Sequence, residues 1–380
     1  MASPQQLPTF KGRPGWEFTD LSGLDLAAYA PAASVGEAAS GLFALPSASA
    51  LPDGVIVAPI ADAAREHGEL LARHLGSLVP AEDVFTILNE AAEFRAGSFV
   101  YVPRGVVLEQ PISLLSVQTE SGTMLNQRTL VVLEEGAEAE VWEQFLSAEA
   151  ELDGVFNVVT ELIVGDNARL RYVCGQDLAE QSWIFGAQRA EVGRDSRLDW
   201  VALGFGSARG HVRMQTRLAG DGADARVTGA YATHGRQHID FDTTQEHAAA
   251  NTTSDLAFRG VLQGRSSAVW KGNIIVDPGA QKTDAFQESR NLLLSKRAHA
   301  DAIPGLEIQA NDVRCTHAAA VAQVDPEQLF YLRSRGLREP EAKRLVIEGF
   351  LAALVERFEE GPVRQVLAGA LEQRLSVILD

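Results

Sequence analysis

Cysteine is scarce in this chain of 380 residues, which contains only Cys174 and Cys315. Two thiols exclude a disulfide framework and a self-contained four-cysteine zinc or iron–sulfur site, and they favour a reducing compartment. The first residues lack the basic and apolar segments of a signal peptide. No stretch approaches the roughly 18 uncharged apolar residues of a membrane span. These absences predict a cytoplasmic protein that does not enter a membrane.

Basic side chains are also few, because 33 lysines and arginines stand against 51 acidic residues and give a formal net charge of −18. Non-specific nucleic-acid binding and attraction to anionic membranes both need clustered positive charge, so we expect neither. Three catalytic signatures are absent as well: the Gly-x-x-x-x-Gly-Lys-Ser/Thr phosphate loop, His-Glu-x-x-His and Gly-x-Ser-x-Gly. The chain should therefore not hydrolyse ATP through a phosphate loop.

Hydrophobic periodicity divides the sequence into three regions. Residues 1–97 form an N-terminal helical region that includes an Ala/Pro/Ser-rich linker at about 30–52. Short runs of β-formers bounded by glycine and proline fill residues 98–322. Residues 323–380 are again helical in pattern. The expected organisation is a β core between an N-terminal helical region and a C-terminal helical domain.

Helix boundaries are marked by capping residues. In the N-terminal region the apolar spacing predicts helices at 61–75 and 81–94. In the C-terminal region Asp325 is a predicted N-cap, Pro326 takes the first helical position and Gly336 follows the last. Two further helices are predicted from near Pro340 and from Pro362, with apolar stripes at Val346, Phe350 and Leu354 and at Val363, Val366, Leu367, Leu371, Leu375 and Ile378.

A glycine turn followed by alternating residues recurs along the β region. The turns begin at Gly136, Gly165, Gly193 and Gly222, which are 29, 28 and 29 residues apart. A fifth begins at Gly264, after a longer gap that indicates an insertion or a different coil. A fixed period with strand content is typical of a β-solenoid. An antiparallel sandwich with evenly spaced hairpins would give the same signals, so the repeat alone leaves both open.

Three of the eight histidines fall in the segment 234–247. On a strand, His238, Asp240 and Asp242 would project to one face, with His234 and His247 at the two ends. Imidazole and carboxylate groups together suit a metal ion or a proton relay. A polar strand face with hydrogen-bonded histidines is the simpler interpretation, and spacing alone favours it.

The segment 306–318 contains a second candidate, Cys315-Thr-His317. Alternation along a strand would place Cys315 and His317 on one face, roughly 6.6 Å apart. Two ligands do not complete a metal or cluster site. A buried cysteine beside a surface histidine, or a Cys/His nucleophilic pair, would fit the same spacing.

Polar residues at Thr283, Asp284 and Gln287 form a third candidate. They could build a ladder on stacked turns of a solenoid. As a catalytic carboxylate Asp284 has no support beyond its residue type, and it is an ordinary turn residue.

Several ordered blocks carry a resemblance to a known family. The sequence resembles the SufB/SufD family of iron–sulfur cluster assembly proteins, and its SufD branch in particular. The resemblance covers most of the chain and is strongest from about 240 to 350. The matching blocks are Trp16–Leu21, Tyr101–Ile112, Arg259–Gly264, Ala280–Gln287, Asn291–Ser295, Leu306–Ala318 and Asp325–Gly336.

The resemblance implies a mainly β fold, with a right-handed parallel β-helix core flanked by N-terminal and C-terminal α-helical domains. It also implies a Suf complex in which the chain is a non-catalytic scaffold, pairs with a SufB-like paralogue and docks the SufC ATPase. The expected SufC-docking residues lie in the C-terminal helical domain: Leu329, Phe330, Tyr331, Leu332, Arg333 and Arg335.

The family further implies that a cluster is built transiently at the SufB–SufD interface, with none held tightly by the isolated chain. His317 holds the position of the family's SufD histidine and is the candidate iron ligand, with Cys315 in a supporting role. The segment 288–294 lacks the cysteine expected of SufB, which favours SufD. An open solenoid end also predicts a homodimer when the paralogue is absent.

A different function class fits a β-solenoid too. Many β-solenoids are polysaccharide lyases or hydrolases that use paired carboxylates along a groove, and the acidic composition supplies carboxylates. The few tryptophans and tyrosines, five of each, weigh against sugar stacking.

Overall fold

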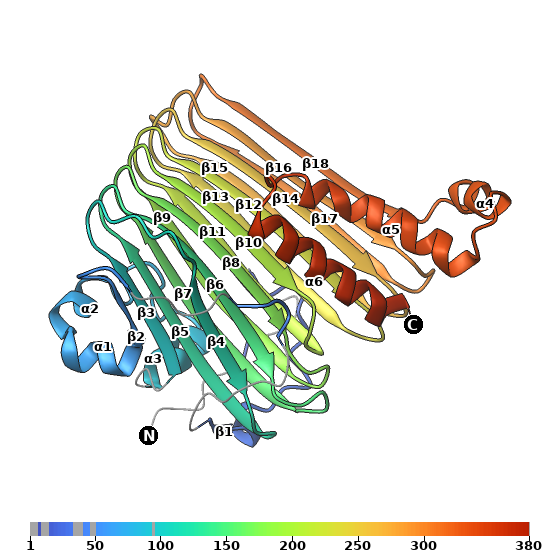
Figure 1. The fold of residues 1–380 in the computed structure, drawn as a ribbon, viewed down its shortest axis with the longest axis horizontal. Helices are drawn as coiled ribbons and strands as arrows, with labels where there is room; N and C mark the ends of the chain where they lie inside the picture. Colours follow the sequence, from blue (N-terminus) through green and yellow to red (C-terminus); the bar gives the residue numbers. More distant parts are fainter. Residues whose placement is uncertain (1–6, 9–14, 33–40, 46–50, 93–95, 380) are drawn as a thin grey trace.

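The computed structural model describes residues 7–8, 15–32, 41–45, 51–92 and 96–379, and strands predominate in that part of the chain. From β3 onward the chain winds as a parallel β-solenoid, in which each coil adds one strand to each of two facing sheets (Figure 1). The pairing is parallel throughout β3–β18. The expectation of a parallel β-solenoid is therefore confirmed, and the sandwich alternative is wrong.

Sheet I contains the odd-numbered strands together with β2, and sheet II contains the even-numbered strands from β4. The strands of sheet I are β1 (Ala30–Pro31), β2 (Ile56–Pro59), β3 (Ala96–Val102), β5 (Thr123–Leu133), β7 (Gly154–Val164), β9 (Trp183–Val192), β11 (Arg209–Leu218), β13 (His238–His247), β15 (Ser267–Val276) and β17 (His299–Ile308). The strands of sheet II are β4 (Ile112–Gln118), β6 (Glu138–Ser147), β8 (Arg169–Asp177), β10 (Arg197–Gly204), β12 (Asp224–Thr233), β14 (Thr253–Leu262), β16 (Asp284–Leu293) and β18 (Arg314–Gln323). Residues 106–108, one of the short apolar runs in the predicted β region, contribute only an isolated bridge, between Val107 and Glu138.

One stack of turns, before the strands of sheet II, explains the glycine repeat. In each of the turns before β4 to β16 one residue has a positive φ, and its N–H donates to a carbonyl of the next turn. Gly165 and Gly193 have a different role, because they allow the backbones of neighbouring turns to approach closely. A Cβ on Gly165, for example, would lie 2.7 Å from the carbonyl oxygen of Leu133. The positive-φ residues of this stack are Gly105, Gly136, Asn167, Asp195, Gly222, Asn251 and Lys282.

The long gap before Gly264 is not an insertion. Asn251, with φ of 57°, occupies the next turn of the stack, and asparagine tolerates this left-handed conformation better than most residues. Gly264 belongs to another stack, before the strands of sheet I, where it lies on Gly235. The sequence repeat had combined two different edges of the solenoid.

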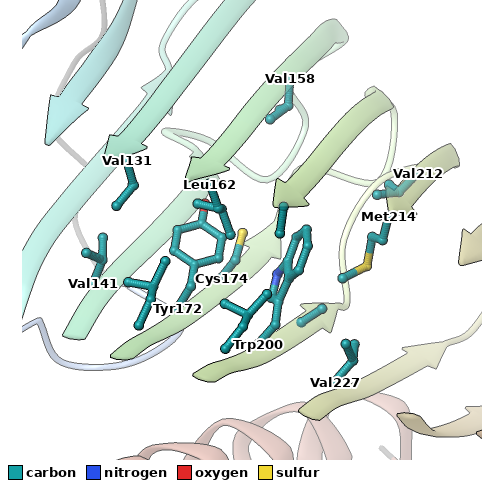
Figure 2. Close-up of a cluster of buried hydrophobic side chains, with 14 of the residues drawn as sticks. Val131, Val141, Val158, Leu162, Tyr172, Cys174, Trp200, Val212, Met214 and Val227 are labelled. Carbon is teal, nitrogen blue, oxygen red and sulfur yellow. The ribbon is translucent and has the colours of Figure 1, made fainter. Parts of the chain in front are cut away.

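The core lies between the two sheets and is filled by inward-facing side chains. Trp200 and Trp270 have no exposed surface, and Tyr172 packs edge-on against Trp200 with ring centroids 5.9 Å apart. Figure 2 shows Tyr172, Cys174 and Trp200 side by side in this core. Burial on this scale, at about 25 cal/mol per Å² of apolar surface, is the main stabilising term of the solenoid.

The N-terminal helices are short. The 3-10 helix η1 (Leu26–Ala28) is followed by α1 (Ile60–Glu66), α2 (Gly68–His74) and α3 (Val84–Ala91). The predicted helix 61–75 is broken at His67, where φ is −132°. Asp83 caps α3 in a capping box with Thr86. The end of the predicted helix 81–94 and parts of the predicted linker lie outside the described residues.

The C-terminal helices are α4 (Pro326–Ser334), α5 (Glu339–Val355) and α6 (Pro362–Leu379). Asp325 accepts from the N–H of Glu327, as its predicted role as N-cap requires. The helices α5 and α6 lie on the outer face of sheet II (Figure 1). Ile347 and Leu351 of α5 belong to one hydrophobic cluster with Val201 and Val261 of that sheet. Of the predicted stripe of α5, Leu354 is buried, whereas Val346 and Phe350 are half-buried next to the buried Ile347 and Leu351. The predicted stripe of α6 is mostly buried.

Candidate interface at the open end of the solenoid

The last coil of the solenoid is uncovered. Among the described residues, β17 pairs only with β15, and β18 pairs only with β16. The inward row of β16 is buried, whereas most of β18 is exposed. We call this last coil, β17 and β18 together, the open end. Its unpaired N–H and C=O groups are available to a further strand.

Cys315 and His317 both belong to the inward row of β18, as alternation predicts. In the register of the sheet, Cys315 lies over Ala285 and His317 lies over Gln287. Gln287 is fully buried and donates to the carbonyl oxygens of Gly272 and Gly305 at 3.3 and 3.0 Å, which joins the two sheets. A rigid support therefore lies beneath His317.

The two side chains differ in environment. Cys315 is half-buried against Ala285 and its neighbours, while His317 is exposed. Burial raises the pKa of the Cys315 thiol, and the nearby Asp284 carboxylate raises it further. The thiol is therefore protonated near neutral pH, so it lacks the activation that a nucleophilic cysteine needs. Within the described part of the chain, no cluster of three or more His, Cys, Asp or Glu side chains is arranged to hold a metal ion.

The open end also carries exposed apolar side chains. Ile303 and Ile308 on β17 and Val321 on β18 keep 37%, 43% and 43% of their surface exposed. Apolar side chains gathered at an unpaired sheet edge are typical of a protein–protein interface.

Helix α4 follows β18 directly and stands apart from both sheets (Figure 1). None of its residues is buried. Phe330 and Tyr331 are 75% and 56% exposed, and the Arg335 guanidinium lies 5.1 Å from the centre of the Tyr331 ring. Leu329 and Leu332 are half-buried. Arg333 forms an ion pair with Glu339 at 3.6 Å. A helix with uncovered aromatic side chains has the character of a docking element.

The histidine segment does not form an open site. His238, Asp240 and Asp242 share the outer face of sheet I, as predicted, but Asp240 is buried there. Its carboxylate accepts from Thr19 at 2.8 Å and lies 2.9 Å from His211. His238 lies 2.7 Å from the Ser267 hydroxyl. The hydrogen-bonded polar face is therefore the interpretation that fits.

The other two histidines of the segment are also engaged. His247 faces the core between the hydroxyls of Thr252 and Ser254, at 2.7 and 2.8 Å, and burial lowers its pKa to about 4. His234 lies 2.8 Å from the Glu180 carboxylate, in an ion pair when the ring is protonated, and near Arg374. Both have structural roles.

The predicted polar ladder is divided between two faces. Thr283 is buried and lies 3.3 Å from Thr252 of the preceding coil, and Gln287 is inward as well. Asp284 points outward and forms an ion pair with Arg314 at 3.9 Å. These three residues therefore do not converge on one site.

Charged residues on the outer faces alternate in sign. Arg171 and Arg226 both pair with Asp199 on sheet II, and Arg217 bridges Glu191 and Glu246 on sheet I. A glycoside-cleaving groove requires a pair of carboxylates around the substrate instead. These ladders fit structural cross-links between coils.

Sequence reasoning missed two groups of residues. One is a buried cluster around Glu143, which accepts from Thr129 at 2.6 Å and from Tyr172. The other is a row of cations at Arg236, Arg265, Lys296 and Arg297, on turns of three successive coils. The row has a signal in the sequence, because Arg236 and Arg265 each follow a turn glycine. This signal can be recognised only once the stacking of the turns is known.

Comparison with known proteins identifies the family of this chain. The family model described as "SUF system FeS cluster assembly, SufBD core domain" matches residues 116–350, and that of the "SufBD protein N-terminal region" matches residues 42–114. The iron–sulfur cluster assembly protein SufD of Bacillus subtilis is 35% identical over 326 residues, which cover 85% of this chain and 74% of the relative. A SufBD family protein of Mycobacterium leprae is 29% identical over 341 residues, with 87% and 85% covered.

A two-sheet parallel β-solenoid whose last coil is uncovered, as far as the described residues show, is thus the class of protein that the fold defines. The chain belongs to the SufBD family, as the resemblance predicted. Among the described residues, no helix is both long and apolar enough to cross a bilayer.

Proposed function

We propose that this chain is a non-catalytic, cytoplasmic scaffold subunit of a Suf complex that assembles iron–sulfur clusters. The observation that carries the proposal is the open end, where His317 and Cys315 lie on a bare strand in a chain of the SufBD family. The B. subtilis relative is named as an iron–sulfur cluster assembly protein SufD.

The open end would pair with a SufB-like paralogue. A second solenoid of the same coil type would continue the hydrogen-bond ladders of β17 and β18 and cover Val321. His317 would then be enclosed between the two chains. We also propose that the β-solenoid winds in the right-handed sense, as the resemblance to the family implies.

The cluster is cargo in this scheme. The imidazole of His317 would offer one ligand to iron, and the paralogue would supply thiolates. Cys315 would act as a neutral neighbour, because its raised pKa disfavours the thiolate. The incomplete ligand set of this chain is consistent with a transient cluster.

Helix α4 would dock a SufC-type ATPase. Phe330 and Tyr331 would insert into an apolar cleft of the partner, and Leu329, Leu332, Arg333 and Arg335 would surround them. ATP hydrolysis would take place in that partner.

The test is anaerobic reconstitution of the chain with its SufB-like and SufC-type partners, followed by titration with iron and sulfide. We expect His317→Ala to lower cluster build-up about tenfold, while the complex still assembles. His299→Ala is the matched control, because His299 is also an exposed histidine of the open end. Equal build-up in the two variants would remove His317 from the site. Failure of the wild-type chains to assemble would contradict the scaffold itself.

A further inference from the structure

Four cations form a row on one edge of the solenoid, which we call the basic ladder: Arg236, Arg265, Lys296 and Arg297. They lie on turns that lead from sheet II into sheet I in three successive coils. The turns are stacked in contact, since the N–H of Arg265 donates to the carbonyl of Gly235 at 2.8 Å and the Ser295 hydroxyl donates to that of Gly264 at 2.6 Å. Neighbouring strands are about 4.8 Å apart, so the ladder spans roughly 10 Å.

The four side chains of the ladder are exposed. Within the described residues none of them forms an ion pair, although arginines elsewhere on the solenoid mostly do. Asp301, the next carboxylate after Arg297 in the chain, lies 3.1 Å from the His299 ring, and Asp325 caps α4. Unneutralised like charges repel one another, and a chain with net charge −18 has carboxylates to spare. The bare ladder is therefore available to an external anion.

The shape of the surface selects the kind of anion. The ladder lines an open hollow of about 700 Å³ whose lining consists of turn backbone and the four exposed cations. A small phosphate ligand is normally held by enclosing walls and buried polar groups. A long nucleic acid would meet repulsion from the rest of this acidic chain. A short acidic patch on a protein surface fits four cations spread over three coils.

The ladder also adjoins the root of α4. The N–H of Val324 donates to the carbonyl of Leu293, so the chain passes over the turn that carries Lys296 and Arg297 just before it enters α4. A protein seated on Phe330 and Tyr331 would lie beside the ladder.

We propose that the basic ladder binds a carboxylate-rich patch on the protein that docks on α4, and so makes that docking a two-point contact. The identity of this occupant rests on the proposed function, whereas the preference of the ladder for protein carboxylates does not. Apolar anchoring on α4 would set the lifetime of the complex, and the ladder would accelerate and orient its formation.

The first test measures the ladder by itself, with a fluorescent octaglutamate peptide and the full chain at low salt. The ladder variant is R236Q/R265Q/K296Q/R297Q. The matched control, R65Q/R104Q/R169Q/R194Q, removes the same charge from arginines in exposed ion pairs, which contribute little to stability. We expect the ladder variant to lose about tenfold in affinity and the control less than about twofold.

Three results would overturn the proposal: no binding of the peptide to the wild-type chain, equal losses in the two variants, or displacement of the peptide by inorganic pyrophosphate at far lower concentration than by free octaglutamate. The last would make the ladder a phosphate site.

The second test uses the SufC-type ATPase and stopped-flow association at several salt concentrations. The ladder variant should associate about tenfold more slowly at low salt and show a flatter salt dependence, while Phe330→Ala should mainly accelerate dissociation. Normal kinetics in the ladder variant with rapid dissociation of Phe330→Ala would sink the two-point contact and leave docking on α4 intact. Slow association of the ladder variant together with normal dissociation of Phe330→Ala would contradict docking on α4, and with it the two-point contact.

Discussion

His317 lies in register over Gln287, the buried side chain that joins the two sheets beneath the open end. The exposed imidazole therefore projects from a rigid floor and not from a loop. A position of this kind would keep a metal-binding group preorganised before a partner arrives.

The isolated chain should form a homodimer through the open end. Val321→Glu should weaken it by about tenfold or more, since a charge would be buried at an apolar interface. Val377→Glu on α6 is the control, as Val377 is 52% exposed but lies away from the open end. Sedimentation velocity over a range of concentrations measures both. A wild-type chain that stays monomeric at high concentration would count against this interface.

Glu143 should contribute more to the stability of the fold in mild acid than at neutral pH. It is fully buried, and desolvation raises its pKa from 4.5 to about 7. The folded state thus holds a proton that the unfolded state releases above pH 4.5. The contribution is complete below pH 4.5 and is lost as the pH rises through 7, by about 3 kcal/mol. Urea unfolding of Glu143→Gln should lack this contribution, while Glu140→Gln, which changes an ion-paired carboxylate on the same strand, should show the same pH dependence as the wild-type chain.

His247 should act in the opposite direction over nearly the same range. Burial lowers its pKa from 6.5 to about 4, so its contribution is present above pH 6.5 and is lost as the pH falls through 4, again by about 3 kcal/mol. Because the two residues offset each other, the wild-type stability should vary little between pH 4.5 and 6.5. His247→Asn should become more stable on acidification, and Glu143→Gln less stable. Parallel pH curves for the two variants would contradict this compensation.

The free energy of unfolding should depend on which residue occupies position 251 in the stacked turns. Asn251→Ala should lower the free energy of unfolding by about 1 kcal/mol, because alanine is strained at φ of 57°. Asn251→Gly relieves the strain but loses the hydrogen bond to Asp221, so its effect should be smaller. Thermal unfolding of the two variants gives the comparison. A more stable alanine variant would show that the turn does not require the left-handed conformation.

Much of the fold could be predicted from local sequence. Alternation and turn residues located the β region, and Asp325 and Pro326 marked the start of α4, because these signals depend on neighbours in the chain. The choice between solenoid and sandwich could not be made locally, since it depends on pairings such as Ala225 with Ser254, a full coil apart. The break in the predicted helix at His67 was missed because no proline marks it.

The candidate site divides in the same way. Alternation was enough to place Cys315 and His317 on one face. Their position on an uncovered strand depends on where the stack of coils stops, which no short motif encodes. The basic ladder was missed for a related reason, because Arg236 and Arg265 become neighbours only when their turns are stacked.

The return of α5 and α6 across sheet II has a mechanical consequence. Arg357, just beyond α5, contacts Thr228 of β12 and Asp255 of β14, and Arg374 of α6 donates to the carbonyl oxygen of Ala232. A pull on α4 would therefore be shared with strands two and three coils inside the edge. The terminal strand would not have to carry that force alone, and the solenoid would tilt as one body before β18 could peel away.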